Sequence, residues 1–244
     1  RHEVERIKGE LISIVSHELR TPLTALRGAI GLLVGGVLGE LPEGPMELLT
    51  IAERNTLRLI TLVNDILDLD RLQRGMLDLR LERVSAARIV QRSIEAVRTF
   101  ADQERIALEV AGVEGSVLGD ESRLVQVLVN LLSNAIKFSP PGSRVTVSAA
   151  VSGAAVLFRV VDRGRGVPAE HRSLIFERFH QVQSGDTRDK GGTGLGLAIS
   201  RSLVQQHGGS IGVEGVEGEP GATFWFRIPN ADGENDLPDD ETGG

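Results

Sequence analysis

Residues 120–142, DESRLVQVLVNLLSNAIKFSPPG, decide how the second part of this 244-residue chain folds. Asp120 predicts a helix N-cap, and the apolar positions after it recur at helical spacing as far as Phe138. The Ser139–Gly142 segment, with two prolines and a glycine, then ends the helix because proline cannot continue the hydrogen-bonded turn. We therefore expect one helix over this stretch.

One face of this helix is polar. Asn130, Asn134 and Lys137 follow one another at spacings of four and three, so two amides and an ammonium group share that face. An amide oxygen is a hard neutral ligand that suits Mg²⁺, which keeps waters and phosphate oxygens in its other positions. A solvated helix face would explain one asparagine, but it explains less well two of them among apolar neighbours.

Helices and strands alternate on both sides of this helix. A mixture of this kind over roughly 150 residues predicts an α/β or α+β sandwich. The expected strands cover residues 77–81, 106–110, 145–151, 154–162, 210–216 and 222–228, and the expected helices cover 85–100, 120–138, a short segment near Pro168, and 195–206.

The first 75 residues have a different periodicity. Apolar residues recur at spacings of three and four over residues 4–33 and again over 48–69, and the Gly- and Pro-rich Gly35–Pro45 segment between them is typical of a turn. The pattern predicts a helical hairpin. Because a lone hairpin has a thin core, we expect two copies to pair as a four-helix bundle, which makes the protein a homodimer.

His17 lies in the string Ser16-His17-Glu18-Leu19-Arg20-Thr21-Pro22 of the first helix. At 100° per residue its side chain points away from the stripe formed by Leu11, Val15 and Leu19, so we expect it to be exposed. A free imidazole is largely neutral at pH 7 and therefore nucleophilic. Glu18, the next residue, is placed to accept the proton of the His17 imidazole. The simpler alternative is that His17 is only a solvated histidine.

Two glycine-containing segments are candidates for binding a ligand. Asp162 follows a strand in Asp162-Arg163-Gly164-Arg165-Gly166, where glycines permit close backbone approach and the carboxylate can accept from an exocyclic amine; an ordinary turn is the alternative. The Gly192–Ala198 segment, GTGLGLA, opens a helix whose N-terminal amides can bind phosphate. It lacks the ending of a P-loop and the spacing of a dinucleotide fingerprint.

The remaining aromatic and histidine residues give weaker signals. Phe176 and Phe179 flank Glu177 and Arg178, and we expect both rings to pack in the core. His171 and His207 are interpreted as solvated, whereas His180 lies where it can shape the loop that follows.

Taken together and in this order, the five motifs resemble the H, N, G1, F and G2 boxes of the sensor histidine kinases of two-component systems. The resemblance implies an α+β chain, with an antiparallel helical hairpin (a dimeric four-helix bundle) followed by an α/β sandwich of the Bergerat ATP-binding type. It implies a homodimer that uses ATP and Mg²⁺ to phosphorylate His17 and passes the phosphoryl group to a response regulator receiver domain. It also implies phosphatase activity toward that regulator.

The resemblance assigns roles to particular residues. His17 is the acceptor, with Glu18 and Thr21 as further catalytic residues, and Asn134 is the metal ligand. Asp162 selects adenine, and residues 180–191 correspond to the ATP lid. The implied nucleotide-binding residues are Asn130, Asn134, Lys137, Asp162, Gly164, Gly166, Arg178, Gly192, Thr193, Gly194, Leu195 and Gly196.

Three domains are expected: a dimerisation and phosphotransfer hairpin at 1–75, a catalytic ATP-binding domain at 76–230, and an acidic, disordered tail at 231–244. Because the chain begins without methionine, we interpret it as a fragment whose upstream part is missing. The resemblance implies that the missing part includes a sensor module and that this fragment is cytoplasmic. The alternatives are an ATPase of the gyrase or MutL type, which disagrees with Asn130 where such enzymes keep a glutamate, and a non-catalytic signalling scaffold.

Composition excludes several other classes of protein. The chain has no cysteine, which excludes disulfides and thiolate metal sites. Much of the net charge of −7 comes from the acidic tail, so the body of the protein is nearly neutral. No basic surface of the kind that binds nucleic acid is therefore expected.

Overall fold

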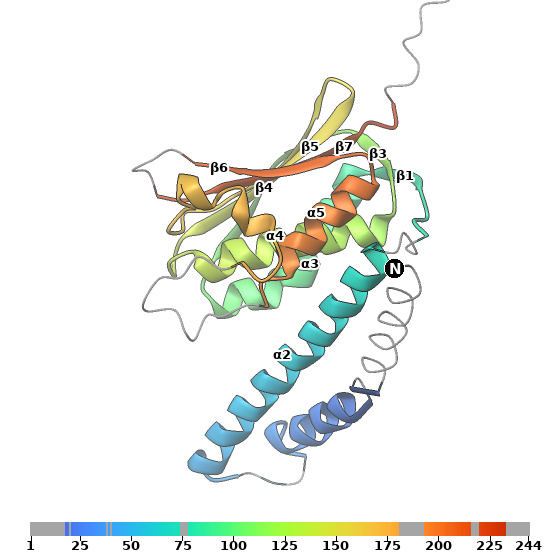
Figure 1. Cartoon of the computed structure of the whole chain (residues 1–244). Helices are drawn as coiled ribbons and strands as arrows, with labels where there is room; N and C mark the ends of the chain where they lie inside the picture. The colour runs from blue at the N-terminus through green and yellow to red at the C-terminus, as the bar shows by residue number, and fades with distance from the viewer. Residues whose placement is uncertain are drawn as a thin grey trace, which may run out of the picture. The chain divides into compact units, whose positions relative to one another are not determined.

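The computed structural model describes residues 18–19, 21–37, 39, 41–73, 78–180, 193–215 and 220–232. The chain divides into two compact units, Arg1–Leu77 and Asp78–Gly244 (Figure 1). No helix in the described part of the chain combines the length and apolar character needed to cross a membrane.

The first unit is helical. Residues 21–34 form one helix, and α2 (Glu43–Gln73) forms the second. A Cβ atom built on Gly31 would lie 3.9 Å from the carboxylate of Glu53 in α2, so the two helices pack against each other. The helix α2 begins inside the expected turn, because Pro45 lies in its first turn, where no backbone N–H is needed. The predicted hairpin is confirmed.

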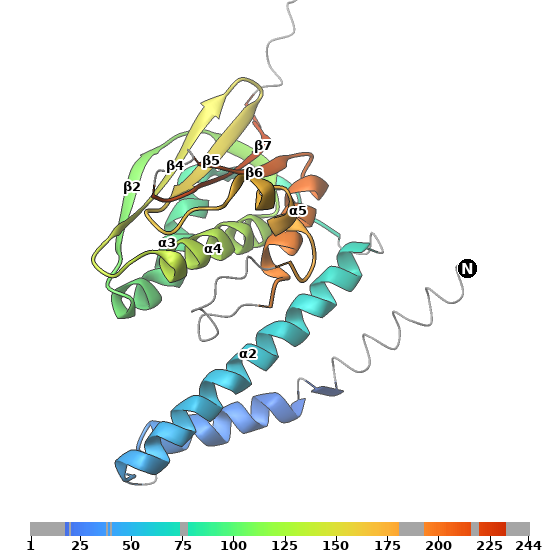
Figure 2. The same ribbon diagram turned by 60° about the vertical axis from the view of Figure 1, so that its left-hand side comes forward.

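The second unit is a layer of helices on a layer of strands. Figures 1 and 2 show α3 (Ala86–Gln103), α4 (Glu121–Phe138) and α5 (Gly196–Gln206) on one face of a five-stranded sheet. The sheet order is β2-β4-β5-β7-β6, and only β2 and β4 are parallel to each other. The strands are β2 (Ala107–Val113), β4 (Arg144–Ser152), β5 (Ala155–Val161), β6 (Ser210–Glu214) and β7 (Thr223–Pro229). The expected α/β sandwich is therefore confirmed.

The core lies between the sheet and the helices. Alternate residues of β5 and β7 are buried against the helices, and the rings of Phe158 and Phe226 stack with centroids 4.6 Å apart. Alternation of this kind is typical of a sheet that has one covered face. The apolar side of α4 fills the same core, since Leu124, Leu128 and Leu131 are fully buried.

The ends of α4 agree with the sequence, but the small sheet beside it does not. Asp120 caps α4 by accepting from the backbone N–H of Arg123 at 3.2 Å. The strand expected at 77–81 is wrong: β1 covers Glu82–Ser85 and pairs with β3 (Ser116–Gly119), which the sequence did not predict. Four residues are too few to show an alternating pattern.

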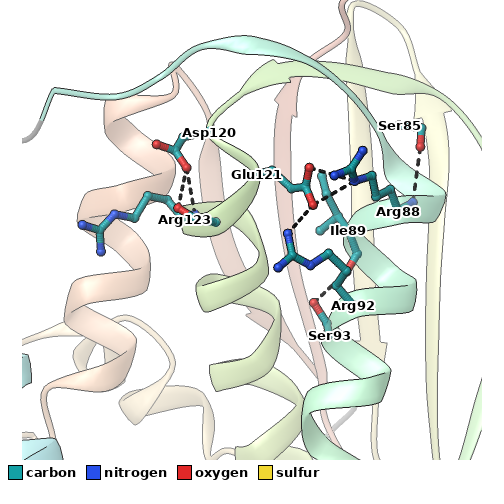
Figure 3. Close-up of polar contacts among 9 residues, drawn as sticks. Ser85, Arg88, Ile89, Arg92, Ser93, Asp120, Glu121 and Arg123 are labelled. Atoms are coloured by element: carbon teal, nitrogen blue, oxygen red, sulfur yellow. Dashed lines mark hydrogen bonds and ion pairs between the residues drawn. The ribbon is translucent and has the colours of Figure 1, made fainter.

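A buried carboxylate connects α3 and α4. Figure 3 shows Glu121, at the first turn of α4, between Arg88 and Arg92 of α3. Its oxygens lie 2.9 Å from Arg88 Nε and 2.6 Å from Arg92 Nη1. The hydrogen bond from Arg92 is the main cause that lowers the pKa of Glu121. Because both guanidinium groups are largely exposed, solvent screens the attraction, and we expect about 1 kcal/mol of stabilisation.

His207 is not solvated, contrary to our expectation, but buried with 6% exposure. Its Nε2 accepts from the backbone N–H of Asp120 at 3.0 Å, so the ring proton lies on Nδ1, which donates to the carbonyl of Leu203 at 2.8 Å. The side chain thus connects the end of α5 to the cap of α4. The bond to Asp120 joins residues 87 positions apart, which local sequence patterns do not reveal.

Candidate functional site

The polar face of α4 forms one wall of the site. Asn130, Asn134 and Lys137 are half-buried, whereas the residues between them, such as Leu131 and Ile136, are fully buried. The helix therefore presents two amides and an ammonium group along one edge of its packed side. The expected grouping of these three residues on one face is what the structure shows.

The turn before α5 forms a second wall. Gly194 has a positive φ of 71°, and the backbone N–H of Leu195 donates to Thr193 Oγ1 at 3.2 Å. No side chain of the described residues caps α5, so the first-turn N–H groups from Gly196 onward are available for an anion. Gly192, also expected here, lies outside the described residues.

The two walls meet at Asn130. Its Nδ2 donates to Ser200 Oγ of α5 at 2.9 Å, and a Cβ atom on Gly196 would lie 2.6 Å from its Oδ1. Only glycine at position 196 therefore lets the start of α5 approach α4 this closely. Ser200 has no signal in the sequence, because an isolated serine in a helix resembles any other.

Asp162 lies at the end of β5, where the sequence predicts a base-selecting carboxylate. Its Oδ1 accepts two backbone N–H groups, from Gly164 at 2.8 Å and from Ala222 at 3.2 Å. Its Oδ2 accepts no hydrogen bond from the described residues that would compete with a ligand's amine. Burial raises the pKa of Asp162, and the two N–H donors oppose this only in part.

Close backbone packing shapes the loop after Asp162. A Cβ atom on Gly164 would lie 2.6 Å from the carbonyl oxygen of Phe138, and one on Gly166, whose φ is 71°, would lie 2.9 Å from that of Gly221. Gly221 and Ala222 are therefore part of the site, although our sequence analysis missed them. Their signal is a glycine directly before the closing strand, which is typical of close backbone approach.

Positive charge gathers beside this loop. Lys137 Nζ lies 5.0 Å from the centre of the Phe138 ring, and the guanidinium carbon of Arg165 lies 4.8 Å from it. Both distances fit cation–π contacts, which fix the two cations near the end of α4. In the sequence, Arg165 has no signal beyond its place between two glycines.

The segment around Arg178 connects to the turn before α5. Phe176 is buried as expected, but Phe179 is 67% exposed and has a φ of 60°. The prediction that Phe179 packs in the core is therefore wrong. Its backbone N–H donates to the carbonyl of Gly194 at 2.9 Å, which holds this segment beside the turn. Arg178 is exposed next to it.

The expected acceptor histidine, His17, lies outside the described residues. Of its neighbours, Glu18 is helical and exposed, and Thr21 is exposed at the start of the helix over 21–34. In the second unit, the start of α5 at Gly196 lies against Asn130 of α4, and the backbone N–H of Gly164 donates to Asp162. Glu18 and Thr21 belong to the helical unit.

Comparison with known proteins gives two family matches. Residues 7–75 match the His Kinase A (phospho-acceptor) domain, and residues 119–232 match the histidine kinase-, DNA gyrase B-, and HSP90-like ATPase family. The first match sets the chain apart from a gyrase-type ATPase, for which a phospho-acceptor domain has no use.

The similar proteins are sensor kinases. The chain is 36% identical to the circadian input-output histidine kinase CikA of Synechococcus elongatus over 91% of its own length and 30% of the relative's. It is 32% identical to the sensor histidine kinase WalK of Bacillus subtilis, over 97% of its own length and 39% of that protein's. The chain therefore spans about a third of the length of these relatives.

Solved structures agree. Full-length ShkA in complex with AMPPNP matches with a TM-score of 0.72 and 35% identity, over 91% of this chain and 46% of that one. The mycobacterial sensor histidine kinase MprB matches with a TM-score of 0.54 and 34% identity, over 62% of this chain and 97% of that one. With both domains matched and the ATP-binding fold formed, the chain belongs to the sensor histidine kinases of two-component systems.

Proposed function

We propose that this chain transfers the γ-phosphoryl group of ATP to a ring nitrogen of His17. The observation that carries the proposal is the convergence, in one unit, of three complementary parts. These are the amide face of α4, the uncapped start of α5 against Asn130, and the buried carboxylate of Asp162. The amide face of α4 suits a metal ion and phosphates, and the start of α5 suits phosphates. The carboxylate of Asp162 suits the amine of adenine.

Each part has a role at the nucleotide. The N–H groups at Gly192–Gly196, together with Lys137, bind phosphate oxygens, and Arg178 approaches them from the neighbouring segment. Asn130 holds the start of α5 in place through Ser200. Gly164 and Gly166 let the backbone approach the flat base.

Asn134 is the residue that fits Mg²⁺. No group of three or more His, Cys, Asp or Glu side chains converges among the described residues, so an all-protein metal cage is not present there. An amide oxygen beside phosphate oxygens and waters is a typical magnesium environment. The ion would supply neutralisation of phosphate charge, and Asn134 would hold it on the polar face of α4.

The chemistry at His17 is a displacement at phosphorus. A nitrogen–phosphorus bond forms as the bond between the γ-phosphorus and the bridging oxygen breaks, and ADP leaves. Glu18 takes the proton from the imidazole. Since the transition state of phosphoryl transfer is loose, the protein's main contributions are positioning and charge neutralisation.

Domain roles and partners follow from this chemistry. We assign dimerisation and phosphotransfer to residues 1–75, nucleotide binding to 76–230, and no catalytic role to the acidic tail at 231–244. A response regulator receiver domain would receive the phosphoryl group on an aspartate, and Glu18 with Thr21 would assist its later dephosphorylation. An upstream sensor module would control the reaction, which uses cytoplasmic ATP.

The labelling chemistry tests this function. Incubation with γ-labelled ATP and Mg²⁺ should label the chain with phosphate that survives alkali and is lost in acid, as a nitrogen–phosphorus bond requires. Asn134→Ala should slow labelling roughly 100-fold or more, because a group that positions transition-state charge is lost. Gln91→Ala, which removes an exposed amide from α3, should label normally. Alkali-labile, acid-stable phosphate on the chain would rule out the histidine.

The helical unit supports a homodimer. The apolar residues that recur at spacings of three and four in α2 form a stripe, here called the seam. Two leucines of this seam are exposed in the single chain, Leu48 at 69% and Leu59 at 48%. Leucines at such spacing are typical of a helical interface. We expect light scattering to give twice the chain mass, and Leu59→Glu to give the monomer mass, because pairing would bury two carboxylates. Thr61→Glu, exposed on the same helix but off the seam, should remain dimeric, and an unchanged mass for both variants would exclude this interface.

A further inference from the structure

Two histidines lie in direct contact at the start of the segment that corresponds to the ATP lid. His171 ends the 3₁₀ helix Ala169–His171, and His180 follows the second 3₁₀ helix, Leu174–Phe176. Nδ1 of His171 and Nε2 of His180 are 3.3 Å apart, and the ring centroids are 5.4 Å apart. Both side chains are half-buried, so the pair is restrained and still reached by solvent.

The distance between the two nitrogens fits either a hydrogen bond or binding of both nitrogens to one metal ion. A pair of neutral imidazoles can share one hydrogen bond at this distance. Two imidazole nitrogens bound at about 2.05 Å to one tetrahedral Zn²⁺ ion would also be about 3.3 Å apart. We propose that His171 and His180 form a two-histidine binding site for a divalent transition-metal ion of the zinc class.

The ligand set selects the kind of metal. Imidazole suits Zn²⁺, Cu²⁺ and Ni²⁺, whereas Mg²⁺ prefers oxygen, so the magnesium that accompanies ATP does not compete for this pair. No third His, Cys, Asp or Glu converges with the pair in the described part of the chain. The nearby carboxylate of Glu177 is engaged by Arg201 at 2.8 Å. Among the described residues, these two imidazoles are thus the ligands, and water would occupy the other positions.

The histidine pair is connected to the phosphate-binding turn through the backbone of Phe179. Phe179, directly before His180, donates its N–H to Gly194 in the turn that precedes α5. A metal ion joining His171 to His180 fixes the segment that carries this bond. The site thus lies next to the phosphate-binding turn without sharing any residue with it.

Direct binding tests the proposal. The whole chain is titrated with Zn²⁺ against a chromogenic chelator in excess Mg²⁺, and Co²⁺ absorption is recorded in parallel. Each of the variants His171→Asn and His180→Gln should raise the Kd of the most tightly bound zinc ion by at least about tenfold. Loss of even an outer-shell partner of a metal ligand has an effect of this size. Glu170→Gln, an exposed neighbour, should bind as the native chain does.

An unchanged far-UV circular dichroism spectrum shows that a histidine variant is folded. If one variant does not fold, the zinc affinity of the other variant tests the proposal. The visible Co²⁺ bands of a tetrahedral imidazole complex should disappear in both variants. Equal zinc affinity in the native chain and the two variants would overturn the proposal, as would the absence of zinc binding by the native chain. Either result would leave the two histidines as a hydrogen-bonded pair only.

Discussion

Replacement of His17 by glutamine is expected to reduce labelling from γ-labelled ATP to background. The glutamine amide has a similar size, but its nitrogen has no lone pair available to attack phosphorus. ATP binding should be unchanged, because the expected nucleotide residues all lie between Asn130 and Gly196, in the second unit. Labelling is measured by filter binding after an alkaline wash, and nucleotide affinity by calorimetry on the same protein.

His2→Gln is the matched control for this experiment. It makes the same chemical change 15 residues earlier in the chain, and it should label at the native rate. Persistent label in the His17→Gln chain would show that another residue accepts the phosphoryl group. Loss of ATP binding together with label would instead indicate damage to the fold.

The sequence predicts local structure well where capping and periodicity act together. Both ends of α4 follow from Asp120 and from the Ser139–Gly142 segment, and α3 begins after Ser85, which accepts from the N–H of Arg88. The hairpin β4–β5 follows from alternation around Gly153. In each case the determining residues are neighbours in the chain.

Contacts between distant segments explain most of the failures. His207 bonds to Asp120, and Ala222 bonds to Asp162, across 87 and 60 positions respectively. His207 has no local signature, because a buried histidine resembles an exposed one in sequence. For Ala222 the only signal is the preceding glycine, which does not identify Asp162 as the partner. The prediction that Phe179 packs in the core was wrong for a different reason. The backbone at Phe179 is left-handed, which turns this apolar side chain out of the core.

Asp162→Asn is expected to reverse the preference for the base. The amide oxygen of the new side chain should occupy the position of Oδ1, because Gly164 and Ala222 both donate hydrogen bonds there. Its NH₂ group then takes the place of Oδ2 and faces the amine of adenine, donor against donor. Loss of one charge-assisted hydrogen bond should weaken ATP by about 2 kcal/mol, or roughly thirtyfold in Kd.

Inosine triphosphate, which has a carbonyl where adenine has an amine, is the matched ligand. The new NH₂ group can donate to that carbonyl, so the Kd ratio of the two nucleotides should move toward inosine. Asp102→Asn, the same change away from the site on α3, should leave the ratio unchanged. An unchanged ratio in the Asp162→Asn chain would mean that this carboxylate does not read the base.

The same ratio should depend on pH in the native chain, in a direction that the environment of Asp162 sets. Burial raises the pKa of this carboxyl, so it takes up its proton at a higher pH than an exposed aspartate does. Above that pKa the ionised Oδ2 accepts from adenine, and the preference for ATP is complete. As the pH falls through the raised pKa, the neutral carboxyl can donate to the carbonyl of inosine, so the preference is lost.

Because both nucleotides carry the same triphosphate, titration of the phosphates cancels in the ratio. Titration of the bases themselves is common to the native chain and the Asp162→Asn chain, so the difference between their slopes belongs to Asp162. The Asp162→Asn chain has no proton to take up at this position, so its ratio should change less with pH than that of the native chain. A native ratio that is equally flat down to the pKa of an ordinary aspartate would contradict burial as the cause. A slope shared by the native chain and the variant would place the titrating group elsewhere.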